Sequence, residues 1–124
     1  NTYINSTKVL NNGFQLRENK NIFFAGQMTG VEGYVESIAS GLYCAINVVR
    51  MLENKPLISF SADTIIGGLY NYLTNANVVN FQPINANFGI LNPINERDKQ
   101  KRNIEYRLRS LKEIETIKNK IEEN

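Results

Sequence analysis

Residues 21–52 read NIFFAGQMTGVEGYVESIASGLYCAINVVRML, and the rest of the chain is interpreted around them. The apolar run Ile22–Ala25 comes first, and glycines follow it at positions 26, 30 and 33. About five turns with apolar residues at helical spacing complete the stretch. This order predicts a strand, a tight glycine loop and a helix. The first N–H groups of such a helix are free, so an anionic or carbonyl-rich ligand can bind there.

The predicted helix carries an apolar face and a second face of small residues. We expect the apolar face to lie on a sheet, and it consists of Val35, Ile38, Leu42, Ala45, Ile46, Val49 and Leu52. Gly33, Ser37 and Gly41 recur at every fourth position, which indicates close approach of a neighbouring backbone. Cys44 lies among apolar residues, so we interpret it as a buried structural thiol and not as a nucleophile.

Length and composition exclude several classes. The 124 residues, 42% of them apolar, are enough for one domain. The first residue is Asn1 and no leader pattern follows, so we expect a chain cut from a longer protein. A single cysteine favours a reducing, cytoplasmic compartment, and the lack of histidine argues against a metal site or Ser-His-Asp catalysis. No apolar run approaches the ~20 residues of a membrane span, so we expect no membrane partner.

The remaining N-terminal segments predict few strands. Residues 1–17 read as extended chain broken by a turn, and with residues 22–25 they give two or three short strands. A free-standing parallel sheet needs more, so the missing strands are expected upstream in a parent chain. The predicted fold class is therefore α/β, with a fragment of a Rossmann-like domain at the N-terminus.

A helical region is predicted for the second half. Pro56 ends the long helix, and a second helix begins nearby with Ser61 or Asp63 as its cap. Residues 75–95 have no period and are interpreted as an ordered loop, with Phe81 and Phe88 in the core. From about residue 95 a last helix runs nearly to the end, and its apolar face consists of Ile104, Leu108, Leu111, Ile114, Ile117 and Ile121.

Charge is concentrated in that last helix. The whole chain has a net charge of +2, whereas residues 97–112 hold seven basic and two acidic residues, a local charge of +5. Such a helix is typical of a solvated amphipathic surface or of a surface that contacts RNA phosphates.

The glycine loop alone is a weak signal, since its spacing fits an ordinary tight turn as well as a cofactor loop. Gln27 directly follows the predicted strand and Gly26. Many flavoproteins end this strand in Gly-Asp, whose side chain holds the ribityl chain of the flavin. Gln27 can form an equivalent hydrogen bond while the helix N-terminus faces the flavin ring.

Three blocks together carry a more specific signal. They are FFAGQMTGVEGYVES at residues 23–37, NTYINS at residues 1–6 and NFQPINANFG at residues 80–89. These blocks resemble the C-terminal part of the folate- and FAD-dependent tRNA (uracil-5-)-methyltransferases, the TrmFO or Gid family, over essentially the whole chain. The MnmG (GidA) family of tRNA-modifying enzymes shares the Gly-Gln-x-x-Gly-x-x-Gly-Tyr pattern but not the third block, and it is the alternative.

The resemblance implies a flavoprotein that moves a one-carbon unit from 5,10-methylenetetrahydrofolate to C5 of a uridine, with NAD(P)H reducing the FAD. It implies that residues 1–55 end the FAD-binding domain and that residues 56–124 form the helical C-terminal region. The pyrophosphate loop and the reactive cysteines of the family lie upstream, so no catalytic residue is assigned here. The residues implied beside the flavin are Ala25, Gly26, Gln27, Thr29, Gly30, Val31, Glu32, Gly33 and Tyr34.

The resemblance also implies an RNA partner, which is tRNA at its T-loop or, alternatively, ribosomal RNA. The RNA-binding residues it favours are Lys99, Lys101, Arg102, Arg107 and Arg109. The second partner implied is the remainder of the parent FAD-binding domain. Residues 80–89 line the folate or RNA cleft, or else they pack against the flavin domain. The other class of function is a non-catalytic RNA- or partner-binding module.

Overall fold

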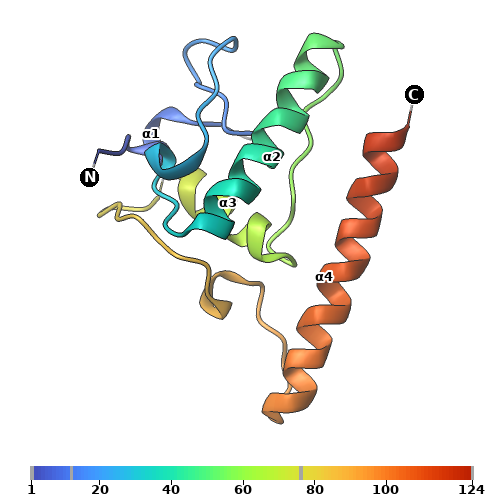
Figure 1. The fold of residues 1–124 in the computed structure, drawn as a ribbon. Helices are drawn as coiled ribbons and strands as arrows, with labels where there is room; N and C mark the ends of the chain where they lie inside the picture. The colour runs from blue at the N-terminus through green and yellow to red at the C-terminus, as the bar shows by residue number, and fades with distance from the viewer. Residues whose placement is uncertain (1, 12, 76, 124) are drawn as a thin grey trace.

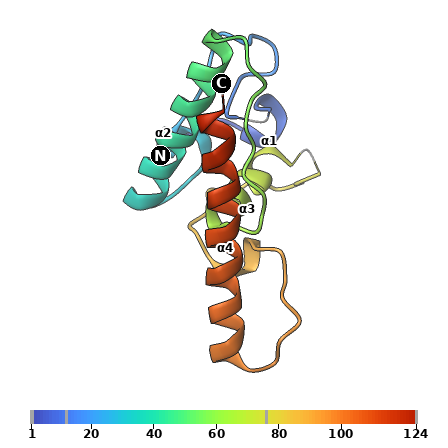
Figure 2. The ribbon, with the colours of Figure 1, turned by 90° about the vertical axis from the view of Figure 1, so that its right-hand side faces the viewer.

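The structure, a computed structural model, describes residues 2–11, 13–75 and 77–123. Its elements in chain order are α1 (Ser6–Val9), the 3₁₀ turn η1 (Gly26–Thr29), α2 (Tyr34–Leu52), α3 (Ile65–Thr74), the 3₁₀ turn η2 (Phe88–Ile90) and α4 (Lys99–Glu122). The first three α-helices and their loops form a body, and α4 extends along one side of it (Figure 1). Figure 2 shows that α4 passes α3 and that its C-terminal end comes close to α2.

The predicted α/β class, with a Rossmann-like strand fragment, is wrong. Across the described residues the only β pairings are three isolated bridges, which join Leu10 to Leu16, Gln15 to Phe23, and Val31 to Ile84. A ladder needs consecutive residues in extended conformation, whereas Phe14, within the N-terminal stretch expected to be extended, has φ +63°. The N-terminal residues instead form the short helix α1. The observed class of the described chain is mainly helical.

The long helix is confirmed, but within the described chain the side of it that is predicted to pack is exposed and another side is buried. α2 begins at Tyr34, after the glycine loop, and ends at Leu52, before Pro56. Its buried residues are Ser40, Tyr43, Cys44 and Asn47, whereas the predicted apolar face is largely exposed. No sheet covers that face among the described residues. α2 therefore joins the body through its more polar side.

Aromatic rings form the centre of the body. Tyr43 of α2, Tyr70 of α3 and Phe14 contact one another with ring centroids 4.9 to 5.4 Å apart. Phe60 also packs on Tyr43, at 4.8 Å, and its backbone N–H donates to the Tyr43 hydroxyl. Burial raises the pKa of Tyr43 to about 12, so this hydroxyl stays protonated at neutral pH. The cluster joins α2 to α3 and fixes the ends of the intervening loops.

The buried side of α2 also fixes the loop that follows it. The side chain of Asn47 is fully buried, accepts a hydrogen bond from the Ile58 N–H at 2.7 Å and donates to the Ile58 carbonyl at 3.0 Å. The side-chain amide of Asn47 thereby satisfies both the N–H and the carbonyl of Ile58, a buried loop residue. This pairing explains an asparagine in the middle of a helix.

The observed cap of α3 lies one residue after Asp63 and three residues after Ser61, the two predicted caps. The cap is Thr64, whose hydroxyl accepts from the Gly67 N–H, and neither Ser61 nor Asp63 has that role. Those two side chains instead face α4, as the next section describes. α4 is capped by Asp98, whose carboxylate accepts from the Lys101 N–H at 3.1 Å.

The apolar face predicted for α4 is mostly exposed. Ile117 is buried in the core, whereas Ile104, Leu108, Leu111, Ile114 and Ile121 are exposed. Near its C-terminal end α4 shares a groove with the end of α2, in which Ile121 faces Ala45, Ile46 and Val49. α4 therefore rests on the body at a few points along its length.

Candidate functional site: the glycine loop and the basic helix

The glycine loop is a short 3₁₀ turn that the rest of the body holds in place. The Thr29 hydroxyl donates to the Gly26 carbonyl at 2.7 Å, which closes η1. The hydroxyl of Ser6, in α1, donates to the Thr29 carbonyl at 2.6 Å. The Gly26 N–H donates to the hydroxyl of Ser40, in α2, at 2.8 Å. Both helices that flank the loop therefore bind it through serine hydroxyls.

Gly30 is the buried corner of the loop. Its φ of +99° lies in the left-handed region that favours glycine. A Cβ atom at this position would lie 2.6 Å from the Phe81 ring, which is closer than any real side chain approaches. Phe81 itself is buried in the core, as the sequence predicts. The glycine is therefore required both by the backbone turn and by the ring packed on it.

Residues 80–89 lie against this loop. Val31 and Ile84 form a parallel bridge, in which the Glu32 N–H donates to the Ile84 carbonyl and the Ile84 N–H donates to the Gly30 carbonyl. The side-chain amide of Asn85 adds a hydrogen bond to the Glu32 carbonyl at 3.1 Å. Two of the three sequence blocks that carry the resemblance are thus neighbours in space.

Glu36 links the same two segments from the first turn of α2. Its carboxylate folds over Gly33 and accepts from the Ala86 N–H at 3.4 Å and from the Asn85 amide at 3.5 Å. An acidic side chain in the first turn also interacts favourably with the helix dipole. These contacts support a structural role for Glu36 in joining residues 80–89 to the loop.

The outer rim of the loop is open. An open depression of about 270 Å³ is lined by Gln27, Gly33, Tyr34 and Ser37, and Tyr34 is 91% exposed. The first intrahelical bond of α2 runs from the Ser37 N–H to the Gly33 carbonyl. The earlier N–H groups of α2 therefore point out of the helix N-terminus beside this depression. They and the Gln27 amide are hydrogen-bond donors available to a ligand.

The residues predicted to lie beside the flavin fall into two groups. Ala25, Gln27, Gly33 and Tyr34 are exposed, and Gly26 and Glu32 are partly exposed. Thr29, Gly30 and Val31 are buried, so within this chain they shape the loop and do not touch its surface. The exposed group fits FAD, because a ring carbonyl or the ribityl chain accepts from such donors. The assignment of these nine residues to FAD stays a prediction.

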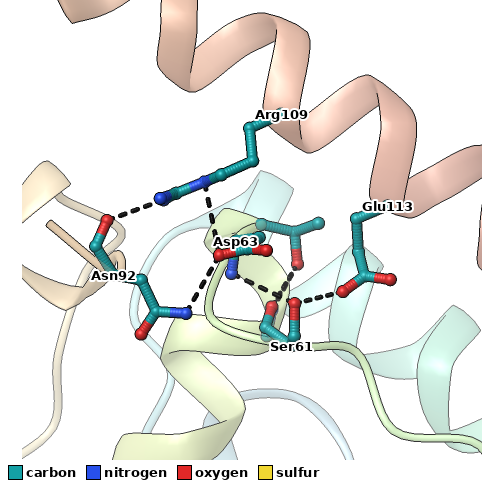
Figure 3. Close-up of polar contacts among 7 residues, drawn as sticks. Ser61, Asp63, Asn92, Arg109 and Glu113 are labelled. Carbon is teal, nitrogen blue, oxygen red and sulfur yellow. Dashed lines mark hydrogen bonds and ion pairs between the residues drawn. The ribbon is translucent and has the colours of Figure 1, made fainter. Parts of the chain in front are cut away.

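The basic helix is attached to the body by a polar cluster (Figure 3). The Arg109 guanidinium donates to the Asn92 carbonyl at 2.6 Å, and its Nε lies 3.3 Å from the Asp63 carboxylate, an ion pair without hydrogen-bond alignment. The Asn92 amide donates to the same carboxylate at 3.0 Å. One turn further along α4, Glu113 accepts from the Ser61 hydroxyl. Arg109 therefore has a structural role.

The other basic residues predicted to bind RNA differ in exposure. Lys99, Lys101 and Arg107 are exposed on α4. Arg102 is partly buried and donates to the Glu96 carbonyl at 3.2 Å. Phe88 is predicted in the core, but it is 59% exposed and stacks on Tyr106 with centroids 5.5 Å apart. Arg109 lies over the same tyrosine ring. α4 thus carries exposed lysine and arginine side chains, and its partly buried Tyr106 stacks on the exposed ring of Phe88.

No catalytic nucleophile or metal site emerges from the described residues. Cys44 is buried, and burial raises the pKa of its thiol, so the thiolate is disfavoured. That agrees with the structural role predicted for it. The described part of the chain contains no group of three or more His, Cys, Asp or Glu side chains placed to hold a metal ion.

Comparison with known proteins shows what the chain is similar to. A family described as Glucose inhibited division protein A matches residues 1–56, which include the glycine loop and all of α2. The chain is 48% identical over 119 residues to methylenetetrahydrofolate–tRNA-(uracil-5-)-methyltransferase TrmFO of Bacillus velezensis, and the match covers 94% of the chain. The resemblance of the chain to the TrmFO family is confirmed.

Other TrmFO proteins match equally well. The chain is 48% identical over 123 residues to TrmFO of Anoxybacillus flavithermus, covering 98% of the chain, and 46% identical over 119 residues to TrmFO of Bacillus subtilis, covering 94%. The match extends through residues 80–89 and α4, beyond the family match at residues 1–56. The chain spans 27–28% of the length of these relatives.

The sequence analysis does not identify three residues that support the glycine loop. Ser6 and Ser40 bind the loop, and Asn85 binds Glu32 and Glu36, yet each lies at least 14 positions away from its partner in the chain. The only signal for Asn85 is its position inside one of the blocks shared with the TrmFO family. The ion pair of Arg109 with Asp63 has no sequence signal, because the two residues lie in different elements.

Proposed function

We propose that this chain is the C-terminal portion of an FAD-dependent methylenetetrahydrofolate:RNA (uracil-5-)-methyltransferase that forms 5-methyluridine in the T-loop of tRNA. The observation that carries the proposal is 46–48% identity to TrmFO proteins along 94–98% of the chain. Since the chain spans 27–28% of those relatives, the activity belongs to the longer protein and the chain alone is inactive.

The glycine loop contributes to the FAD site in this proposal. FAD, reduced by NAD(P)H, supplies the electrons that turn the one-carbon unit of 5,10-methylenetetrahydrofolate into a methyl group. The donors that this chain offers are the amide of Gln27 and the first N–H groups of α2, around the open depression. Thr29, Gly30 and Val31 hold the backbone of the loop behind those donors. The loop thus orients the flavin and keeps its donors fixed before the flavin arrives.

α4 contributes an RNA-contacting surface in this proposal. Lys99, Lys101 and Arg107 are exposed and free to meet phosphates, and Arg102 adds a partly exposed charge. Arg109 positions the helix through Asp63 and Asn92. Phosphate contacts orient an RNA without reading its sequence, so the choice of uridine rests with other parts of the enzyme. A tRNA substrate also places the protein in the cytoplasm.

The experiment uses the full-length protein that contains this chain. Unmodified tRNA transcript, 5,10-methylenetetrahydrofolate, FAD and NADPH are incubated with the enzyme, and nucleosides are quantified by mass spectrometry. We expect 5-methyluridine in the wild-type transcript and none when the T-loop uridine is replaced by cytidine. If the enzyme methylated ribosomal RNA and left the tRNA unmodified, the T-loop assignment would be contradicted.

The alternative is a GidA-type enzyme that modifies the wobble uridine, and the family match at residues 1–56 favours it as the second candidate. The same assay separates the two, because a GidA-type enzyme leaves the T-loop unmodified and changes the anticodon nucleoside. A protein that shifts tRNA on a gel and yields neither product would be a binding module.

A further inference from the structure

A pocket lies between α3, η2 and α4, and it shares no lining residue with the depression beside Gln27. Its volume is about 240 Å³, and its apolar wall consists of Ile65, Leu91, Leu111 and the rings of Phe88 and Tyr106. Pockets for drug-sized molecules measure about 300–1,000 Å³, so this one has room for a single ring system. We call it the aromatic pocket.

The ring of Phe88 is fixed before any ligand arrives. The side chain of Asn87 accepts from the Gly89 N–H at 2.8 Å and closes η2. The backbone of η2 also packs so closely on α3 that a Cβ added to Gly68 would lie 2.5 Å from the Ile90 carbonyl oxygen. Tyr106 stacks on Phe88 at an interplanar angle of 22°. Phe88 is nevertheless 59% exposed, so the stack of two rings ends in an open aromatic surface.

The polar groups of the pocket favour a nucleobase as the flat ligand. Unpaired bases stack on aromatic side chains and form hydrogen bonds through their edges. Asn103 and Ser110, both from α4, line the pocket. An amide and a hydroxyl each donate and accept, which matches the mixed donors and acceptors on the edge of a base. An aliphatic side chain of a protein partner would use neither group.

The charges beside the pocket favour a strand with several phosphates. Arg107 lines the pocket and is exposed, and Lys99 is exposed one helical turn before Asn103, on the same face of α4. Eight residues separate the two cations, about 12 Å along the helix axis, so they reach different phosphates. The carboxylate of Asp63, also at the wall, is engaged by Arg109 (Figure 3).

We propose that the aromatic pocket binds one unpaired nucleobase of an RNA strand, stacked on Phe88 with its edge toward Asn103 and Ser110. Arg107 then holds an adjoining phosphate. The inference rests on the proposed function, in which α4 contacts RNA only through phosphates, and it adds a contact to a base. Because the pocket is separate from the depression assigned to FAD, this base is not the uridine that is methylated. Binding therefore requires a second nucleotide that can leave its stack.

The test compares two eight-nucleotide RNA strands on the full-length protein with bound FAD. One strand is octaadenylate, and the other has the same phosphates but abasic sites at its four central positions. Both carry a red dye at the 3′ end, and binding is measured by fluorescence anisotropy. Phe88→Leu keeps an apolar side chain and removes the ring. We expect this variant to bind octaadenylate about tenfold more weakly than wild type and the abasic strand equally well.

Two further variants separate stacking from a change in the fold. Phe88→Tyr retains the ring and should bind both strands as wild type does. Tyr3→Leu removes a ring that is 38% exposed and lies outside the pocket, so it is the matched control and should leave both affinities unchanged.

An unchanged affinity of Phe88→Leu for octaadenylate would overturn the inference, and so would an equal loss with both strands. If Phe88→Leu raised the KM for NADPH and left strand binding unaltered, the pocket would belong to the dinucleotide and the RNA assignment would be wrong. Methyl transfer to tRNA is measured on the same wild-type preparation. Methylation without an effect at Phe88 refutes the pocket alone, whereas the effect at Phe88 without 5-methyluridine refutes the proposed function alone.

Discussion

The glycine loop and α4 are held in very different ways. The loop is fixed by contacts from three separate segments, which are α1 through Ser6, α2 through Ser40, and residues 80–89 through Phe81 and Ile84. α4 is held by the polar cluster around Arg109, by Ser61 and by the single buried side chain of Ile117. The surface proposed for FAD is therefore rigidly built, whereas the surface proposed for RNA is attached at a few points.

The largest effect is expected at the buried corner of the loop. Gly30→Ala places a Cβ against Phe81 and forces a positive φ, which together should cost about 2–5 kcal/mol in the free energy of unfolding. Gly26→Ala is the matched control, because it has φ +74° and no atom within 4 Å of its Cβ, and it should cost only about 1–2 kcal/mol. Urea unfolding of both variants measures the difference. Equal destabilisation would mean that Phe81 does not restrict the loop.

The second largest effect is expected on the buried side of α2. Asn47→Ala leaves the N–H and carbonyl of Ile58 buried without partners, and we expect a loss of about 2–4 kcal/mol in the free energy of unfolding. Asn71→Ala, at an exposed position of α3, should change stability by less than about 0.5 kcal/mol. If the two substitutions had the same effect, the Asn47 hydrogen bonds would not hold the loop after α2.

Sequence patterns predict some parts of the fold and not others. The bounds of α2 and α4 follow from apolar periodicity and from Pro56. Periodicity locates an apolar face but does not say what covers it, which is why the sequence does not reveal the buried side of α2. The strand prediction is wrong because the short β-prone runs pair only through isolated bridges, and Phe14 between them adopts a left-handed backbone.

For the candidate site as well, the sequence predicts some features and not others. The sequence identifies the glycine loop as one unit, but only the packing separates its buried residues, such as Gly30, from its open rim, such as Gln27. Arg107 and Arg109 are the same residue type two positions apart. One is exposed and the other is bound to Asp63, a difference set by residues far away in sequence.

The third effect concerns RNA binding by α4. Lys101→Ala combined with Arg107→Ala should weaken tRNA binding by the full-length protein about tenfold or more and reduce the salt slope by about one to two units. The control pair Lys8→Ala and Lys20→Ala removes the same charge from exposed positions outside α4. The tRNA affinities of the two double variants are measured at several salt concentrations and compared. An unaltered slope in the α4 variant would identify its basic side chains as a solvated surface.

The smallest effect is expected at the attachment of α4. Arg109→Ala removes an ion pair and a hydrogen bond that are both partly exposed, so stability should fall by about 1 kcal/mol. Hydrogen exchange in α4 should become faster while exchange in α2 is unchanged. Lys112→Ala, an exposed lysine on the same helix, should leave both rates unaltered. Faster exchange throughout the protein would show that α4 and the body unfold as one unit.

In the proposed function the open rim of the glycine loop faces FAD. Gly33 has φ +102° and ψ +149°, a conformation almost confined to glycine, and it lines the depression beside Gln27. Flavin per polypeptide is measured by absorbance in purified full-length protein carrying Gly33→Ala, with Gly41→Ala, a glycine of α2 outside the loop with no atom within 4 Å of an added Cβ, as the control. We predict that Gly33→Ala loses most of its flavin while Gly41→Ala and wild type retain theirs. Full flavin content in a folded Gly33→Ala protein would contradict the account.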